Sequence, residues 1–501
     1  MDLMTQDARL ADARGGDSEH FDVLIVGAGI SGIASAHHLR AQNPGTSFVV
    51  LEALESFGGT WLSHRFPGIR SDSDLYTFGY RFKPWVGPPI ALAEEIRKYM
   101  GDVIEENDLG RHIRYGHSVR SASWSSDDNL WTLVAEGPDG GEARFTAGFL
   151  WMCQGYYRHQ EGYTPEWQGM ETFKGVIAHP ENWPADLDYT GKRVVIIGSG
   201  ATAATMAPAM AGKAAHVTVL QRSPTYFIAQ PNQNDFMEML KPLGLDAHLV
   251  HEIVRRKVVV DFDEITRRCF EEPEVVVAEL LAGIEAYIGP EEVKKHFTPT
   301  YLPWRQRIAI LPDGDMMEEI KQGRVSMVTD HIDRFVPEGI LLKSGQVLEA
   351  DVIATATGFN LSVLGDIAFS IDGKPLAFHE TVTYRGTMFT GVPNMAWVFG
   401  YFRNSWTLRS ELVADFVCRL LRHMDEKGAR RVEVGLRRED HNMPLGSFID
   451  PENFNAGYLM RGLALLPQRG DKPEWRHTQD YWWEKDVFPA IDLDGEEFRY
   501  G

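Results

Sequence analysis

Two segments of the chain repeat one pattern, in which an apolar run leads through a glycine-rich turn into a stretch with helical spacing. The first is FDVLIVGAGISGIASAHHLRAQ from Phe21, and the second is GKRVVIIGSGATAATMAPAMA from Gly191. Continuous apolar runs such as residues 23–26 and 194–197 are typical of buried parallel strands. Each segment is followed by another apolar run, SFVVLE or HVTVLQRSP. The pattern therefore predicts an α/β fold with two Rossmann-like dinucleotide-binding domains.

Other parts of the chain lack this strand–turn–helix pattern. Residues 229–300 show apolar residues at helical spacing, as in VVVAELLAGIEAYI, so we expect a helical insertion that shields a catalytic cleft. A further helical stretch begins at Ser405-Trp406-Thr407-Leu408 and continues to Leu421.

The first glycine turn, GAGISG, has the features of a nucleotide site. Gly27 permits a tight turn, Gly29 lets a pyrophosphate approach the backbone, and Gly32 lets helix and strand pack closely. The free N–H groups and the positive dipole at the helix start favour phosphate. Glu52 ends the next strand where an acid accepts a ribose hydroxyl, and its charge repels a 2′-phosphate. This site is expected to bind FAD or NAD and to exclude NADP.

The second turn, GSGATA, leads to the opposite charge. Ala203 stands in place of the third glycine, where helix packing needs only a small residue. The following strand ends in Gln221 and Arg222 instead of an acid. A guanidinium suits a 2′-phosphate, so we expect NADPH here; the alternative for Arg222 is a solvated surface side chain. The residues predicted to bind this cofactor are Gly198, Gly200, Thr202, Ala203 and Arg222.

Composition narrows the class of protein. A chain of 501 residues is too long for one ordinary core, so two or three domains are expected. The 50 basic and 71 acidic residues give a net charge of −21, which disfavours nucleic acid and anionic membranes as partners. Cys153, Cys269 and Cys418 form no CxxC pair. Their spacing argues against a disulfide scaffold, a zinc site and a redox-active dithiol, and we expect no metal.

The ends and the hydropathy of the chain bear on its location. Residues 1–20 have neither an apolar core nor a small-residue cleavage site, so we interpret them as a flexible tail and not as a signal peptide. No run reaches the ~18 apolar residues that span a bilayer. We expect a cytoplasmic protein without integral membrane association; the sequence leaves its oligomeric state open.

Three further motifs carry a family resemblance. FKGVIAHPENWP fits the pattern F-x-G-x-x-x-H-x-x-x-W-P with Phe173, Gly175, His179 and Trp183. Residues 58–72, GGTWLSHRFPGIRSD, match a second motif, and DVIATATGF contains an "ATG" linker. The motifs follow one another in the order that is typical of one family, and they cover most of the chain. The chain therefore resembles the type I Baeyer–Villiger monooxygenases. The tryptophan of the first motif favours this branch over the related N-oxygenating flavin monooxygenases.

The resemblance implies an enzyme that reduces FAD with NADPH, captures O2 as a flavin C4a-peroxide and inserts one oxygen atom into a ketone. The substrate would be a small hydrophobic ketone, which gives an ester or lactone, with sulfoxidation of thioethers as a side activity. Arg307 is implied as the cation that stabilises the peroxide and the adduct. Asp72 is implied as its partner, although the sequence leaves a turn-forming role open for Asp72 and for Asp74.

The resemblance also implies roles beside the cofactors. Trp61 is expected near the isoalloxazine. The helix that begins at Ser405 either directs N–H groups at a flavin carbonyl or is an ordinary capped helix. Gln306 replaces a lysine that many family members place before the catalytic arginine, so NADPH preference should depend more on Arg222.

The motif before the second nucleotide unit is expected to act as a hinge that couples domain rotation to cofactor position. Direct proton transfer by His179 is the alternative. The implied hinge residues are Phe173, Gly175, His179 and Trp183.

These assignments divide the chain into parts. Residues 21–155 should form the first part of an FAD domain, residues 156–355 an NADPH domain with the insertion, and residues 356–501 the rest of the FAD domain and a C-terminal tail. The main alternative function is a flavin monooxygenase acting mainly in S- or N-oxygenation. A flavin disulfide reductase would need paired cysteines, and the presence of both Asp72 and Arg307 argues against a flavin-binding sensor without turnover.

Overall fold

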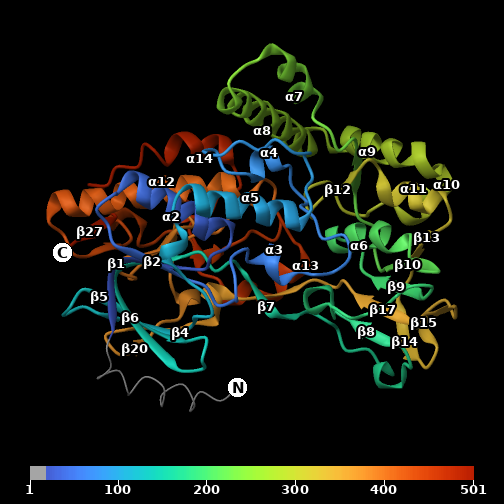
Figure 1. The fold of residues 1–501 in the computed structure, drawn as a ribbon, viewed down its shortest axis with the longest axis horizontal. Helices are drawn as coiled ribbons and strands as arrows, with labels where there is room; N and C mark the ends of the chain where they lie inside the picture. The colour runs from blue at the N-terminus through green and yellow to red at the C-terminus, as the bar shows by residue number, and fades with distance from the viewer. Residues whose placement is uncertain (1–17) are drawn as a thin grey trace.

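The computed structural model describes residues 18–501, so most of the tail predicted over residues 1–20 lies outside the described part. The largest sheet has nine strands. They are β1 (Glu19–Val26), β2 (Phe48–Leu51), β3 (Ile113–Arg114), β4 (Ser118–Ser125), β5 (Leu130–Glu136), β6 (Glu142–Met152), β19 (Ala368–Ile371), β20 (Lys374–Pro375) and β23 (Met395–Trp397). Their order is β20-β19-β4-β5-β6-β1-β2-β3, with β23 also paired to β6 (Figure 1).

Strand β1 begins at Glu19, inside the predicted tail. Glu19 and His20 pair in parallel with Phe145 and Thr146 of β6. Because β6 extends into an antiparallel meander with β4 and β5, it offers backbone partners to residues whose polar side chains give no strand signal. The apolar part of β1 behaves as the pattern predicts.

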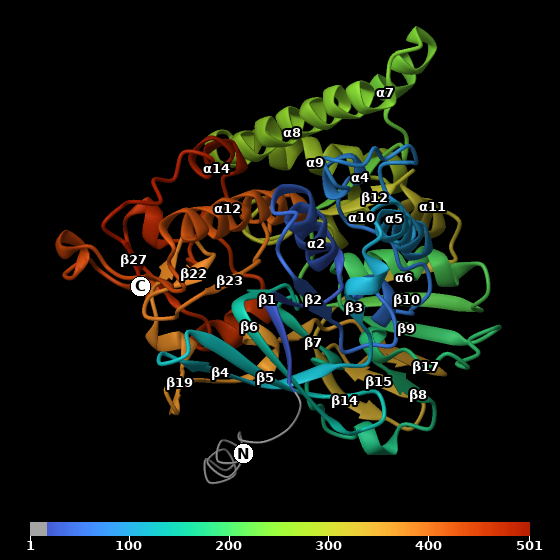
Figure 2. The ribbon, with the colours of Figure 1, turned by 60° about the vertical axis from the view of Figure 1, so that its left-hand side comes forward.

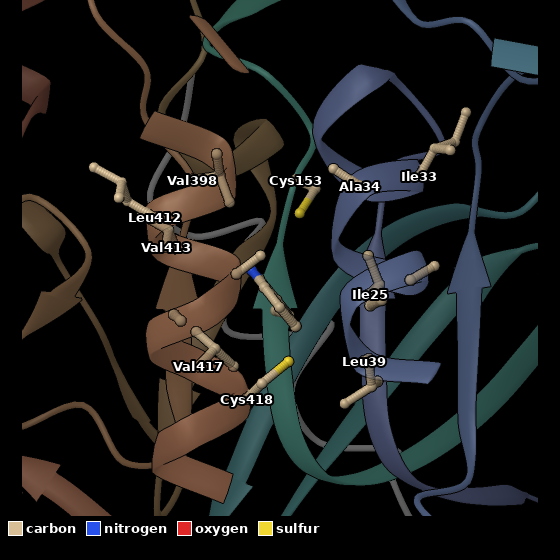
Figure 3. Packing of buried hydrophobic residues seen from close by; sticks show 14 of the residues in the cluster. Ile25, Ile33, Ala34, Leu39, Cys153, Val398, Leu412, Val413, Val417 and Cys418 are labelled. Carbon is tan, nitrogen blue, oxygen red and sulfur yellow. The ribbon is translucent and has the colours of Figure 1, made fainter. Parts of the chain in front are cut away.

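Successive residues of β1 face two separate cores, as the twofold period of a strand requires. Val23 and Ile25 belong to the core beneath the helices, whereas Leu24 and Val26 belong to a core shared with the meander. The helices on the first face are α2 (Ile30–Gln42), α5 (Ala93–Glu106) and α12 (Trp406–Lys427). Figure 3 shows apolar residues of α12 packed opposite those of α2, so the C-terminal third of the chain completes the first nucleotide unit.

The second sheet is parallel, in the order β13-β10-β9-β17-β8. Its strands are β8 (Val176–Ala178), β9 (Arg193–Ile197), β10 (His216–Gln221), β13 (Val325–Thr329) and β17 (Val352–Thr355). Helix α6 (Ala201–Ala211) and helix α11 (Asp315–Lys321) share a core with one face. On the other face, Val195 and Ile197 pack with Phe335 and Ile340 of a small antiparallel sheet, β14 (Ile332–Val336), β15 (Gly339–Leu342) and β16 (Val347–Glu349). The predicted α/β fold with two Rossmann-like units is confirmed.

Two connections join the sheets and run side by side. The chain leaves β6 through β7 (Tyr157–Gly162) and returns from β17 through β18 (Phe359–Leu361). These strands pair antiparallel, with Leu361 opposite Tyr157. The crossings therefore form one two-stranded ribbon, which we call the hinge ribbon because it lies beside His179 of the motif that the sequence predicts to act as a hinge.

The stretch with helical spacing forms α7 (Asp235–Leu240), α8 (Ala247–Glu271), α9 (Pro273–Ile288) and α10 (Pro290–His296). Helix α8 lies over the first unit, above α12 and α14 (Tyr481–Val487), as Figure 2 shows. Arg255 of α8 donates hydrogen bonds to the carbonyls of Tyr76, Thr77 and Gly79, at the end of α4 (Leu75–Phe78), and pairs with Glu411 at 2.9 Å. This buried contact ties the insertion to the first unit. No helix in residues 18–501 has the length and apolar character that a bilayer crossing requires.

Candidate active site

A cavity of about 1070 Å³ lies between the two glycine turns. Gly27 and Gly29 line it from the first turn, and Gly198 and Gly200 from the second. Ligand sites in open parallel sheets lie at the carboxyl ends of the strands, and both turns follow such ends. Within the described chain, none of residues 229–300 lines the cavity. The helical insertion therefore does not wall this cleft, contrary to the expectation that it shields it. Helix α8 contacts the first unit, whereas α9 and α10 pack in a core of the second unit.

In the first turn, two of the three glycine positions leave no room for a Cβ atom. Gly27 has φ +102°, and a Cβ there would lie 2.7 Å from the carbonyl oxygen of Cys153. A Cβ on Gly32 would lie 1.8 Å from the carbonyl oxygen of Gly27, inside any allowed contact. At Gly29 the nearest atom would be Cα of Gly59 at 3.8 Å. Gly32 therefore serves packing, whereas Gly29 leaves free space in front of the start of α2.

Glu52 lies at the end of β2 and lines the cavity although it is buried. Its Oε2 accepts a hydrogen bond from the Ala28 N–H at 2.6 Å, and its Oε1 accepts one from the Leu54 N–H at 2.9 Å. Burial raises the pKa of this carboxyl, and the two N–H groups oppose that rise. Each carboxylate oxygen has a second lone pair. The side chain is therefore fixed in place and still able to accept a ribose hydroxyl.

The second turn repeats this geometry with one substitution. Gly198 has φ +123°, and a Cβ there would lie 2.3 Å from the carbonyl oxygen of Ala356, whereas Gly200 faces open space. Ala203 is buried against the sheet and, unlike Thr202, does not line the cavity. A small side chain is accommodated at the position where the first unit needs Gly32.

The two candidates for phosphate recognition at the end of β10 both line the cavity but differ in burial and in hydrogen bonding. Gln221 is buried and donates to the carbonyl of His296 at 2.6 Å and to Oγ1 of Thr329 at 2.9 Å. Arg222 is exposed at the cavity, and no residue of the described chain forms an ion pair or hydrogen bond with it. Gln306 lines the same cavity. Arg222 therefore presents a guanidinium that is free to bind an anion.

Arg307 also lines the cavity and is held on several sides. Its Nε lies 2.7 Å from Oδ2 of Asp72. Its Nη1 donates to the Phe402 carbonyl at 2.7 Å, and its Nη2 donates to Oγ of Ser73 at 2.9 Å and to the Asp72 carbonyl at 3.2 Å. A guanidinium has five N–H donors. Within residues 18–501, Nε faces Asp72 as an ion pair without a hydrogen bond, and only one of the two Nη1 hydrogens has an acceptor. The charge is thus held in position while a donor of Nη1 remains unused.

The neighbouring aspartate has a different role. Asp74 is the N-cap of α4, where its Oδ1 accepts a hydrogen bond from the Tyr76 N–H at 2.8 Å. Burial raises the pKa of Asp74 to about 7. Asp74 caps a helix and Asp72 pairs with Arg307, so the local capping role that the sequence left open for both carboxylates belongs to Asp74.

Aromatic side chains form much of the remaining wall. Trp61 lines the cavity and packs edge-on against Phe78, with ring centroids 5.6 Å apart. Trp406, the first residue of α12, donates from Nε1 to Oγ of Ser31 at 2.8 Å and stacks on Tyr156 at 5.2 Å. Sequence reasoning missed one set of wall residues, which come from separate segments without a local motif: Tyr156, Phe402, Asn404, Phe454 and Tyr458.

None of the four hinge-motif residues lines the cavity. Nδ1 of His179 accepts a hydrogen bond from the Glu181 N–H at 3.1 Å, and Nε2 lies 3.2 Å from the Gly358 carbonyl, beside the hinge ribbon. Burial lowers the pKa of His179 to about 4. A Cβ on Gly175 would lie 2.3 Å from the carbonyl oxygen of Asp351, and Trp183 and Phe173 pack in the two cores of the second unit. A neutral, fully bonded His179 favours the hinge role over proton transfer.

Comparison with known proteins gives the family. The sequence matches the pyridine nucleotide-disulphide oxidoreductase family over residues 21–280. It is 43% identical over 487 residues to the FAD-containing monooxygenase EthA of Mycobacterium tuberculosis, covering 96% of this chain and 98% of EthA. It is 42% identical over 464 residues to the probable FAD-binding monooxygenase AlmA of Acinetobacter sp, covering 92% of each chain. The chain belongs to the FAD-containing monooxygenases.

Solved structures agree with this family at the level of the fold. Oxidized steroid monooxygenase bound to NADP has a TM-score of 0.75 at 24% identity, covering 96% of this chain and 99% of that one. OTEMO in complex with FAD and NADP has a TM-score of 0.75 at 20% identity, covering 97% and 100%. The fold of this FAD-containing monooxygenase is thus similar to that of Baeyer–Villiger monooxygenases that bind FAD and NADP.

The cysteines separate this monooxygenase from disulphide reduction, in spite of the family match. Cys153, Cys269 and Cys418 are all buried and free. Burial raises the pKa of their thiols to about 12, 11 and 12, respectively. Only thiolates exchange with disulfides. Within residues 18–501 no cluster of histidine, cysteine and carboxylate side chains could hold a metal ion.

Proposed function

We propose that this protein is an NADPH- and FAD-dependent Baeyer–Villiger monooxygenase. It inserts one oxygen atom from O2 into a small hydrophobic ketone, which gives an ester or lactone, and it oxidises thioethers at sulfur as a side activity. The observation that carries this proposal is the Arg307–Asp72 pair, which faces the cavity shared by both glycine turns. A cytoplasmic location, where NADPH is available, is part of the proposal, and the buried free cysteines are compatible with a reducing compartment.

The residues of the first turn fit FAD. The space in front of Gly29 admits a pyrophosphate to the N–H groups that begin α2. Glu52 is fixed where it can accept from the ribose, and Trp61 lies further along the same cavity. Bound FAD would take two electrons from NADPH and transfer them to O2, which supplies the inserted oxygen atom.

The residues of the second turn fit NADPH. Gly200 and Thr202 begin α6 and offer backbone N–H groups to a pyrophosphate. Arg222 supplies an unpaired guanidinium for the 2′-phosphate. Gln306, a neutral amide at the same cavity, adds no charge. Recognition of NADPH over NADH therefore depends on one arginine.

Arg307 would act on the reacting oxygen. A guanidinium stays charged at any working pH, and this one is fixed by Asp72, Ser73 and the Phe402 carbonyl before substrate arrives. A preorganised cation stabilises negative charge that develops on oxygen. The free Nη1 hydrogen supplies the donor, and Asp72 balances part of the charge when the site holds no anion.

The aromatic wall accounts for the substrate class. Phe402 contributes the carbonyl that holds Arg307, and its ring stacks on Phe454 at 5.2 Å. Tyr156 and Tyr458 line the cavity beside them. Aromatic surface of this kind favours a hydrophobic substrate, and a carbonyl placed there would lie near Arg307.

Product analysis tests the proposal. The purified holoenzyme is incubated with NADPH, ¹⁸O2 and a panel of ketones and thioethers, and products are identified by mass spectrometry. One ¹⁸O atom in an ester or lactone is expected. Sulfoxides without any ester would favour an S-oxygenating flavin monooxygenase, and NADPH oxidation without labelled product would refute both.

Two arginine variants, a test and its matched control, examine the role of Arg307. Arg307→Ala should retain FAD reduction by NADPH and lose labelled ester. Arg305→Ala removes a nearby arginine that lies outside the cavity wall and binds the Glu452 carbonyl, and it should keep ester formation. Full ester yield from Arg307→Ala would remove that residue from the mechanism.

A further inference from the structure

His64 and Glu181 form a buried pair that the proposed mechanism does not use. His64 Nε2 lies 3.8 Å from Glu181 Oε1, and the two side chains are 4% and 0% exposed. Neither His64 Nε2 nor either oxygen of Glu181 has a hydrogen-bond partner within residues 18–501. A buried carboxylate without a partner costs several kcal/mol. Each of these two side chains is therefore the only ion-pair partner of the other within the described residues.

The pair connects two motifs that are far apart in the sequence. His64 directly follows α3 (Thr60–Ser63), a short helix that contains Trp61 and belongs to the same motif as Asp72. Glu181 lies in the 3₁₀ turn η3 (Pro180–Asn182), inside the hinge motif. The contact thus joins the flavin-side loop to the segment expected to act as a hinge.

The same loop also contacts the hinge ribbon. The His64 ring stacks on Tyr157 of β7 and on Phe359 of β18, with centroids 5.8 Å apart in each case. Oγ1 of Thr60 bonds to the Tyr157 hydroxyl, and Oγ of Ser63 lies 3.0 Å from Nδ1 of His159. The loop is thereby fastened to both crossings between the sheets, and among these contacts the His64–Glu181 pair is the one that joins a basic to an acidic side chain.

The titratable groups around the pair leave His64 as the counterpart of Glu181. From β7, His159 has its pKa lowered to about 4, first by burial and then by the charge of His64. From the hinge motif, His179 has its pKa lowered to about 4, chiefly by burial. Burial raises the pKa of Tyr157 well above its usual value, and Glu181 and Asp72 add to that rise. At neutral pH these neighbours are uncharged, and they cannot compensate a carboxylate at position 181.

We propose that His64 and Glu181 are positioning residues, which pair with each other and hold the hinge motif against the flavin-side loop in the orientation that hydride transfer requires. This inference rests on the proposed function in so far as it assumes FAD in the first unit and NADPH in the second. If the ribbon turned far enough to separate the pair, a carboxylate or an imidazolium would be left in apolar surroundings. The free-energy cost of burying an unpaired charge therefore opposes this rotation of the hinge ribbon.

A double-mutant cycle without cofactor tests the pairing. His64→Phe should lower the thermal midpoint of the apoprotein because Glu181 then loses its partner. Adding Glu181→Met should recover part of that loss, because it removes the stranded carboxylate. Strictly additive effects would overturn the pairing.

Stopped-flow reduction of FAD by NADPH, without oxygen, tests the positioning role. Glu181→Gln keeps the size of the side chain, and it should slow flavin reduction about tenfold and change its pH dependence while leaving the Kd for NADPH within about twofold. Ser63→Ala removes a parallel, uncharged contact and should leave both the rate and the pH profile near wild type. A wild-type rate and profile in Glu181→Gln, or the same loss in both variants, would refute the inference.

Two features keep these outcomes decisive. His64→Gln should reproduce the slow reduction, so it carries the test if Glu181→Gln does not fold as holoprotein. Flavin reduction is measured before oxygen or ketone is added. If flavin reduction is slow in the variants and the wild-type enzyme forms no labelled ester, the proposed ketone oxidation is refuted, whereas the positioning role is supported.

Discussion

Replacing Gly32 with alanine tests whether the first turn is built around a missing side chain. The added Cβ would lie 1.8 Å from the Gly27 carbonyl oxygen, whereas Cβ atoms do not come within 3.0 Å of other heavy atoms. Helix α2 and strand β1 must therefore separate by more than about 1 Å. Overpacking of this kind costs roughly 1–3 kcal/mol. At about 2–4 °C per kcal/mol for a unit of this size, the thermal midpoint should fall by about 2–12 °C.

Gly29 provides the matched control in the same turn. Its Cβ would meet nothing closer than 3.8 Å, and its φ of −75° suits any residue. As the N-cap of α2, alanine is poorer than glycine by at most about 1 kcal/mol. The methyl group would stand where we place the pyrophosphate. Losing one or two charge-assisted hydrogen bonds, at about 1.5–3 kcal/mol each, weakens FAD binding by roughly 10-fold to 20,000-fold.

The assay separates folding from cofactor binding. Flavin content is read from the absorbance ratio of flavin to protein after desalting, and the thermal midpoint is measured on the apoproteins. Gly29→Ala should keep a midpoint near wild type and lose flavin, which excess FAD restores. Gly32→Ala should melt early even as apoprotein. A wild-type midpoint for Gly32→Ala would refute the packing argument, and full flavin retention by Gly29→Ala would refute the pyrophosphate placement.

Three further outcomes are expected. Arg222→Ala should raise the KM for NADPH about 10–100-fold and leave the KM for NADH nearly unchanged, because one charge-assisted contact contributes about 1.5–3 kcal/mol; equal changes would contradict the assignment. Ser73→Ala removes one hydrogen bond to Arg307 and should lower the yield of oxygenated product per NADPH about 2–10-fold, whereas an unchanged yield would exclude the serine from positioning. The folded-state pKa of His159 is lowered from 6.5 to about 4, so between these values the unfolded chain binds more protons and stability falls as the pH drops, by up to about 1.4 kcal/mol per pH unit. His159→Gln should weaken the pH dependence of the thermal midpoint between about pH 4 and pH 6.5. An unchanged slope of midpoint against pH would exclude this residue as the cause.

Local physical chemistry made the two nucleotide turns predictable from sequence. A glycine-rich turn indicates close steric contacts between residues a few positions apart, such as Gly27 and Gly32. A continuous apolar run indicates a strand that is buried on both faces. The charge that ends each following strand, Glu52 or Arg222, could be assigned to a cofactor because the strand sets its position. Helical spacing likewise predicted the insertion and α12.

Tertiary structure decided the contacts that join distant segments. Arg307 and Asp72 are 235 positions apart, and only their packing shows that Asp72 forms the ion pair while Asp74 caps a helix. The aromatic wall, the outward placement of the insertion and the His64–Glu181 pair gave no periodic or local signal. Such contacts depend on how two sheets and the hinge ribbon pack together, and that arrangement is the sum of many weak interactions that no single stretch of sequence records.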